Sequence, residues 1–107
     1  MKEIKNVADF KAIIETGKPV LLDFYANWCG PCRALLPTVE KLAEAHSEDF
    51  EIVKVNVDTN RELAQEFGVR SIPALFFLKN GEVQERLTGV QTESILESKI
   101  QQYSVAI

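Results

Sequence analysis

Cysteine is scarce in this 107-residue chain, which has only Cys29 and Cys32, separated by two residues. A disulfide across that spacing closes too small a loop to stabilise a fold much, so the chain lacks the disulfide framework of small secreted domains. A chain of this length can bury a core without such crosslinks, and we expect one domain over residues 1–107. The value of such a bridge would therefore have to be chemical.

Long apolar runs and blocks of like charge are also missing. No segment is long enough to cross a bilayer, and residues 1–5 lack the apolar stretch of a signal peptide. The 16 acidic and 12 basic residues are scattered, with a net charge of -4, so there is no basic stripe for nucleic acid or an anionic membrane. We therefore expect a cytoplasmic monomer with no nucleic-acid partner and no membrane partner.

What the chain does contain is an alternation of strand-like and helix-like segments. The segment 20–26 is almost continuously apolar apart from Asp23, which is typical of a central strand covered on both faces. Asn6 and Thr92 are placed to cap the first and last helices, and Asn80-Gly81 predicts a type I′ hairpin. Further strands are predicted at 50–57, 74–79 and 82–87, and helices at about 7–16, 31–46, 59–67 and 93–103. With one more strand placed before the first helix, the order β-α-β-α-β-α-β-β-α predicts an α/β fold with a mixed sheet between helices.

The pair Cys29-x-x-Cys32 has three interpretations when it is considered alone. Metal ligation is one, but a closed zinc site needs four ligands, and beyond carboxylates the chain offers only the distant His46. Two small hydrophobes at a helix start are the second. Dithiol redox chemistry is the third, and the motif alone does not choose between metal and redox.

The redox interpretation has a physical basis. If the helix begins near Pro31, Cys29 lies just before its N-terminus, where free amide groups and the helix dipole favour the thiolate. Cys32, one turn inside the helix, is then placed to attack a mixed disulfide formed at Cys29. Gly30 and Pro31 keep the intervening turn tight. Trp28 is either a core residue or a lid on the thiols, and its spacing does not decide.

Motifs along most of the chain closely resemble the thioredoxin family. They are Asp23-Phe24-Tyr25-Ala26, Trp28-Cys29-Gly30-Pro31-Cys32, Pro37, Val57-Asp58, Phe67-Gly68-Val69-Arg70-Ser71-Ile72-Pro73, Lys79-Asn80-Gly81 and Gly89. The resemblance implies a thioredoxin fold, with five strands lying in the order first, third, second, fourth, fifth and helices on both faces. It implies a protein-disulfide reductase with Cys29 as exposed nucleophile and Cys32 as buried resolving thiol.

The resemblance also gives roles to charged residues. Asp23 would be costly to bury without a partner, and the residue pattern alone leaves open that it reaches solvent at a sheet edge. By resemblance, Asp23 is the buried proton acceptor beneath Cys32, and Lys54 is the lysine near that carboxylate. Without the resemblance, Lys54 is a solvated strand residue with a snorkelling stem.

A loop and an edge complete the implied site. The resemblance implies a cis peptide before Pro73 and an Ile72 backbone that pairs with an extended substrate, whereas residue statistics alone favour a trans bond. Gly89 is either a bulge or a side-chain-free wall of the substrate groove. Trp28, Gly30 and Pro31 complete the implied substrate surface. We expect no metal site, and no catalytic role for His46.

The resulting hypothesis is a reductase recharged from outside. The chain has no Gly-rich dinucleotide loop, so the resemblance implies that NADPH acts only indirectly, through thioredoxin reductase. The only redox group is the Cys29–Cys32 disulfide, and the substrates are disulfide-containing proteins. Alternatives are an oxidase or isomerase of the same fold, a binding subunit that does not use its thiols, and a metal-binding protein.

Three residues depart from the commoner family pattern. Ala74 follows the proline where threonine is frequent, Asn27 precedes the tryptophan, and Arg33 follows Cys32 where lysine is usual. None of them removes a catalytic group, and they bear on the choice of reductase and substrates.

Overall fold

The computed structural model describes residues 1–104, and residues 105–107 of the predicted domain lie outside the described part. The elements along the described part are β1 (Lys2–Ile4), α1 (Val7–Glu15), β2 (Val20–Tyr25), α2 (Gly30–Ala45), β3 (Glu51–Asn56), α3 (Arg61–Glu66), β4 (Ala74–Lys79), β5 (Glu82–Thr88) and α4 (Glu93–Ser104). Type and order are as the sequence predicts, and most bounds differ by a residue or two.

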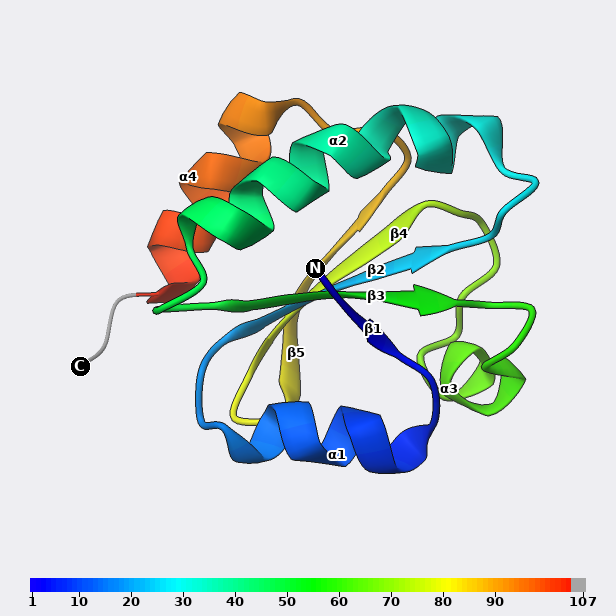
Figure 1. Cartoon of the computed structure of the whole chain (residues 1–107), viewed down its shortest axis with the longest axis horizontal. Helices are drawn as coiled ribbons and strands as arrows, with labels where there is room; N and C mark the ends of the chain where they lie inside the picture. Colours follow the sequence, from blue (N-terminus) through cyan, green and yellow to red (C-terminus); the bar gives the residue numbers. More distant parts are fainter. Residues whose placement is uncertain (105–107) are drawn as a thin grey trace.

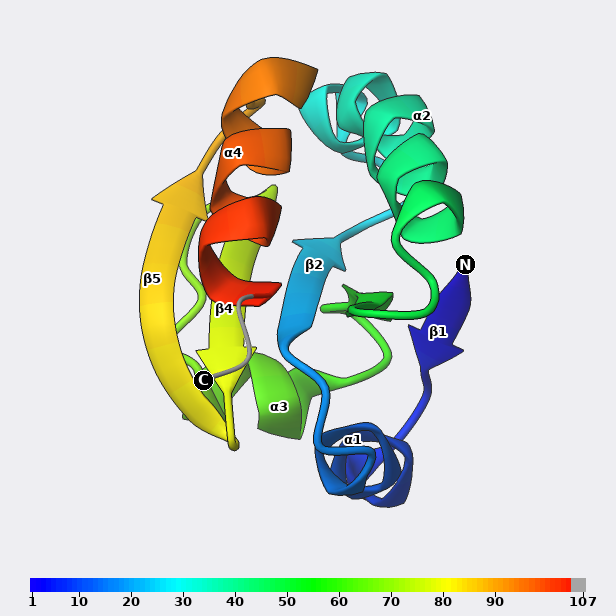
Figure 2. The same cartoon turned by 90° about the vertical axis from the view of Figure 1, so that its left-hand side faces the viewer.

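A five-stranded mixed sheet carries the fold. Its strand order is β1-β3-β2-β4-β5, which confirms the order implied by the resemblance. β1 and β2 both pair with β3 in parallel, whereas β4 is antiparallel to β2 and to β5. Helices α2 and α4 cover one face, and α1 and α3 lie on the other (Figures 1 and 2). The central β2 is thus enclosed on both faces, which explains its apolar run.

The core is divided by the sheet into two clusters. One lies on the α1 and α3 side and includes Ile13, Leu22, Phe24, Val55 and Leu63. The other lies on the α2 and α4 side and includes Leu35, Val39, Leu42, Phe77, Leu96 and Ile100. Because alternate strand residues face opposite sides, Leu21 and Asp23 share the face covered by α2.

Local signals account for most ends of the elements. The Asn6 side chain accepts the amide of Asp9 at 2.8 Å, which confirms the predicted cap of α1. Asn80 and Gly81 both have positive φ, 54° and 80°, as a type I′ turn requires. The backbone N–H of Ile95 donates to the Thr92 hydroxyl at 3.2 Å, as a cap of α4 should.

Two local predictions are wrong. α3 begins at Arg61 rather than Thr59, because the Asn56 side chain accepts the amides of Asp58 and Thr59 and holds a separate turn before the helix. Of the two interpretations of Gly89, the bulge is wrong, because the register shift of the β4–β5 ladder lies between Phe77 and Leu78. Gly89 instead follows the end of β5.

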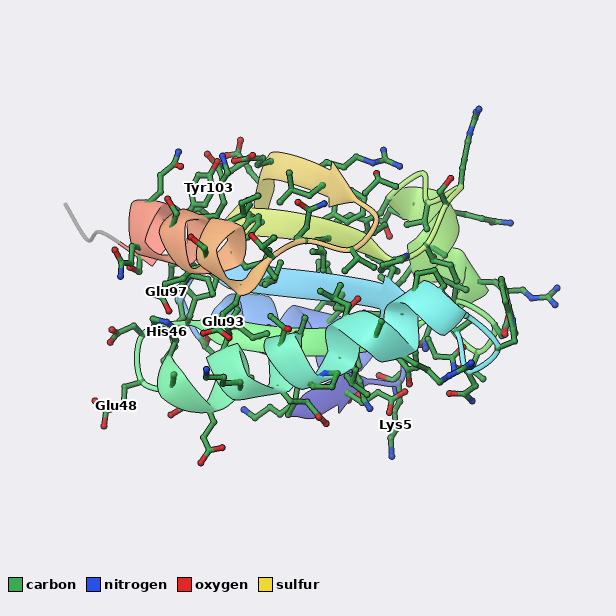
Figure 3. The ribbon with its side chains drawn as sticks, turned by 90° about the horizontal axis from the view of Figure 1, so that it is seen from above. Lys5, His46, Glu48, Glu93, Glu97 and Tyr103 are labelled. Atoms are coloured by element: carbon green, nitrogen blue, oxygen red, sulfur yellow. A yellow bond between two sulfur atoms is a disulfide. The ribbon has the colours of Figure 1, made fainter. Side chains whose placement is uncertain are left out.

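Helices α2 and α4 are linked side by side (Figure 3). His46, the C-cap of α2, lies 2.9 Å from Glu97 through Nε2, and Lys41 pairs with Glu93 at 3.1 Å. The His46 ring therefore bridges two helices, in line with its predicted place at a helix end. These contacts fix the C-terminal half of α2 and leave its N-terminus just beyond the end of β2 (Figure 1).

Candidate active site

The two cysteines lie where the chain passes from β2 into α2. Cys29 is the N-cap of α2, with extended backbone angles, and it forms a disulfide with Cys32. The backbone N–H of Cys32 donates to Cys29 Sγ at 3.2 Å. Gly30 and Pro31 form the first two positions of the helix, where proline loses no hydrogen bond. When the pair is reduced, a Cys29 thiolate would accept a hydrogen bond from the same Cys32 amide. The positive end of the α2 dipole would also stabilise its negative charge.

The prediction that Cys29 is exposed is wrong for this disulfide form. Cys29 and Cys32 are each 4% exposed, so exposure does not distinguish them. The two cysteines form a buried cluster with Ala26, and Tyr25, Val57 and Ile72 pack against that cluster. What distinguishes the cysteines is position, since Cys29 lies at the helix end and Cys32 inside the first turn.

The loop before β4 faces the cysteines. The Ile72–Pro73 peptide is cis, as the resemblance implied. The carbonyl oxygen of Ile72 lies 3.8 Å from Cys29 Sγ, which has no proton to donate while it is in the disulfide. The backbone N–H of Gly89 donates to the Pro73 carbonyl at 2.8 Å and so joins the end of β5 to this loop.

Gly89 has a φ of 87°, and a Cβ at this position would have no neighbour within 4 Å. Its backbone therefore favours glycine, and the space beside it is open.

Trp28 lies on the surface beside the cysteines. It is 68% exposed, so the core interpretation is wrong. Its indole Nε1 donates to Asp58 Oδ2 at 2.9 Å, which anchors an otherwise exposed ring. The sequence did not assign a role to Asp58, although the residue belongs to one of the motifs.

Asp23 is buried in the centre of the sheet, so the sheet-edge interpretation is wrong. It is 2% exposed, and Oδ1 has no hydrogen-bond partner among residues 1–104. Burial raises its pKa from the ordinary 3.8 to about 7, and the charge of Lys54 opposes that rise. A carboxyl with this pKa can take up or release a proton near neutral pH.

A cleft of about 200 Å³ brings Asp23, Cys32 and Lys54 together. Lys54 is the direct neighbour of Asp23 across the β2–β3 ladder. The rest of the lining comes from the end of β2, the loop that follows, and α2: Tyr25, Ala26, Asn27, Arg33 and Leu36. The cleft thus gives Cys32 and the buried carboxyl of Asp23 a shared opening.

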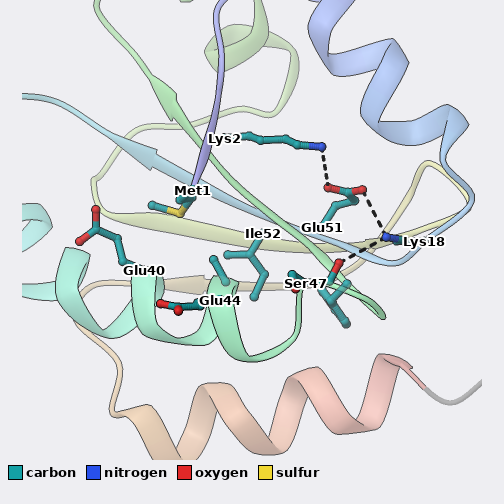
Figure 4. A pocket seen from close by; sticks show the side chains of 10 residues that line it. Met1, Lys2, Lys18, Glu40, Glu44, Ser47, Glu51 and Ile52 are labelled. Atoms are coloured by element: carbon teal, nitrogen blue, oxygen red, sulfur yellow. Dashed lines mark hydrogen bonds and ion pairs between the residues drawn. The ribbon is translucent and has the colours of Figure 1, made fainter.

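A larger cleft of about 740 Å³ lies away from the cysteines (Figure 4). Its most buried charge is Glu51, which Lys2 and Lys18 approach at 3.7 and 3.9 Å. The Lys18 ammonium also donates to the Ser47 carbonyl at 3.3 Å. Because no cysteine lines it, this cleft is separate from the disulfide site.

Residues 1–104 show neither a metal-binding cluster nor a membrane-spanning helix. They contain no group of three or more His, Cys, Asp or Glu side chains arranged to hold a metal ion. No helix in this part of the chain is both long and apolar enough to span a bilayer.

Comparisons with known proteins agree with this geometry. A family model described as Thioredoxin matches residues 2–102. The thioredoxin of Alicyclobacillus acidocaldarius subsp. acidocaldarius is 44% identical over 93 residues, covering 87% of this chain and 89% of its own. That of Haemophilus influenzae is 41% identical over 92% of each chain. The crystal structure of Fasciola hepatica thioredoxin superposes with a TM-score of 0.88 at 36% identity, covering 96% of this chain and 99% of that one.

Proposed function

The chain belongs to the thioredoxin family and is a dithiol–disulfide oxidoreductase, and we propose how its residues divide the work of reducing protein disulfides. One observation carries the proposal. Cys29 caps the N-terminus of α2, bonded to Cys32 and facing the Ile72 carbonyl. Family proteins act on disulfide substrates and receive electrons from reductases, and here the redox-active group is the Cys29–Cys32 pair itself.

In the first step, the Cys29 thiolate attacks one sulfur of a substrate disulfide. The substrate S–S bond breaks, a mixed disulfide forms at Cys29, and one substrate thiolate leaves. The amide of Cys32 and the N-terminus of α2 stabilise the attacking thiolate. An extended substrate segment pairs with the Ile72 backbone, between Trp28 on one side and Gly89 on the other.

In the second step, Cys32 resolves the mixed disulfide. Asp23 accepts the Cys32 proton, either directly or through water in their shared cleft, and Lys54 adjusts the proton affinity of Asp23. The Cys32 thiolate attacks Cys29 Sγ and releases the second substrate thiolate. The substrate gains two electrons and the protein is left with the Cys29–Cys32 disulfide.

We further propose that an NADPH-dependent thioredoxin reductase returns the protein to its reduced form. We also propose that the protein itself works as a monomer in the cytoplasm. A compartment that keeps thiols reduced suits a reductant. We also propose that residues 1–107 form a single domain. The family match over residues 2–102 and the two core clusters on a single sheet support that proposal.

Insulin reduction tests this function. Purified protein with NADPH and thioredoxin reductase should reduce insulin disulfides catalytically, and each mole of NADPH consumed should yield two moles of insulin thiol. The Cys29→Ser/Cys32→Ser double variant serves as the control and should be inactive. Equal activity in the double variant would refute the proposal.

A further inference from the structure

Three charged residues lie side by side across neighbouring strands. In the sheet register, Lys54 of β3 is aligned with Asp23 of β2 on one side and with Glu3 of β1 on the other. All three side chains share the face under α2, since alternate residues of each strand point the same way. Lys54 therefore has two carboxyl groups competing for one ammonium.

Tyr25 reaches across this row. Its hydroxyl donates to Glu3 Oε2 at 2.7 Å, although the two residues belong to strands separated by β3. On the way its ring lies against Lys54, with the ammonium 5.3 Å from the ring centroid. Burial and the Glu3 carboxylate raise the pKa of Tyr25 to about 12, so the hydroxyl remains a donor throughout the physiological pH range.

The Lys54 ammonium lies near the Tyr25 ring and forms no close ion pair with either carboxyl group of the row. Among the ion pairs found within 4.0 Å in residues 1–104, none joins Lys54 to Glu3 or to Asp23. Glu3 has its hydrogen bond from Tyr25 instead, and the ammonium rests near an aromatic ring, a favourable place for a cation. The charge of Lys54 consequently still acts on Asp23 and lowers its pKa.

We propose that Tyr25, anchored by Glu3, is a positioning residue that keeps Lys54 available to Asp23 by occupying the competing carboxylate. The inference extends the proposed function, because it matters for catalysis only if Asp23 is the proton acceptor. The charged groups around Asp23 are Lys54 on β3, Glu3 on β1 and Arg33 on α2. From α2 it also meets the disulfide-bonded Cys32, and its β4 partner is the apolar Leu75.

The test is the titration of the Asp23 carboxyl carbon by NMR in the oxidised protein, where neither cysteine titrates. Tyr25→Phe keeps the ring but frees Glu3 to pair with Lys54, so the Asp23 midpoint should rise by about 0.5 pH unit or more. Glu3→Gln removes the competitor and should lower the midpoint. In the double variant no competitor remains, and adding Tyr25→Phe to Glu3→Gln should have no further effect.

The chain offers a matched control. The Tyr103 hydroxyl donates to Glu85 at 2.6 Å, so Tyr103→Phe deletes the same kind of bond away from Asp23 and should leave the midpoint unchanged. If Tyr25→Phe does not fold, Tyr25→Leu, which also lacks the hydroxyl, replaces it with the same expected direction. An unchanged midpoint in the single variant, or an equal rise with and without Glu3, would overturn the inference.

The inference and the proposed function fail separately. If the midpoints move as expected but Asp23→Asn resolves mixed disulfides at the normal rate, the positioning holds and the catalytic role of Asp23 falls. If Asp23→Asn slows the resolving step but Tyr25→Phe leaves the midpoint in place, the catalytic role holds and the inference falls.

Discussion

Replacing Asp23 with asparagine should stabilise the oxidised protein, and by an amount that depends on pH. The buried carboxyl has a pKa of about 7 in the folded chain, against an ordinary value of 3.8. Well below pH 3.8 it is protonated in both folded and unfolded chains, and no charge is buried. As the pH rises from 4 to 7, the unfolded chain ionises freely while the folded chain resists, so the wild type loses stability.

The size of that loss follows from the two pKa values. Each pH unit between them is worth about 1.4 kcal/mol, so the displacement from 3.8 to about 7 amounts to about 4 kcal/mol. Asp23 is 2% exposed, so water does little to reduce this cost. Asparagine has nearly the same shape and no charge, so the free energy of unfolding of the variant does not fall in this way as the pH rises.

The assay is urea unfolding of wild type and Asp23→Asn at several pH values from 4 to 8. Because all other titrating groups are common to both proteins, their contributions cancel in the difference between the two free energies of unfolding. That difference should grow in favour of the variant by about 4 kcal/mol between pH 4 and pH 8. Asp49→Asn, which alters an exposed carboxylate, is the control and should show no such growth. A difference for Asp23→Asn that stays within about 1 kcal/mol over the whole range would refute the reasoning.

Two further substitutions test neighbouring parts of the site. Lys54→Met removes the charge that lowers the pKa of Asp23, so the carboxyl should titrate above pH 7, and NMR titration showing no rise would exclude an effect of this lysine. Gly89→Ala forces alanine to a φ of 87° and should cost about 1 kcal/mol of stability in urea unfolding. A methyl group at this position meets nothing within 4 Å in the free protein. A clear rise in the KM for insulin in the folded variant would therefore indicate that substrate approaches Gly89. An unchanged KM would count against Gly89 as a wall of the substrate groove.

The parts of the site that could be predicted from sequence have strong local signals. The apolar run 20–26 predicted a central strand, and β2 is one, whereas the burial of Asp23 within it was implied only by the family resemblance. The two-residue spacing, with Pro31 after Gly30, placed Cys29 at a helix start, where the structure has it. These features depend on a few consecutive residues, so periodicity and capping rules suffice.

The parts that could not be predicted depend on distant segments meeting. The burial of Cys29 comes partly from Ile72, 43 residues further along, which no local pattern reveals. The contact between Tyr25 and Glu3 requires knowing that β1, a strand of three residues, pairs with β3. That strand is too short to show a clear alternation of apolar and polar residues. Once its register is known, Glu3, Lys54 and Asp23 are seen to form one row, and Tyr25 lies on the same face of the sheet as that row.

The division of labour between the two cysteines is most directly tested by trapping the mixed disulfide. Reduced Cys32→Ser and Cys29→Ser proteins are each mixed with insulin, quenched with acid, and examined by mass spectrometry. The account predicts that Cys32→Ser accumulates one covalent insulin chain on Cys29, because nothing resolves it, and that Cys29→Ser forms adducts far more slowly. Full turnover of insulin by Cys32→Ser, or equally rapid adducts on Cys32 in the other variant, would contradict it.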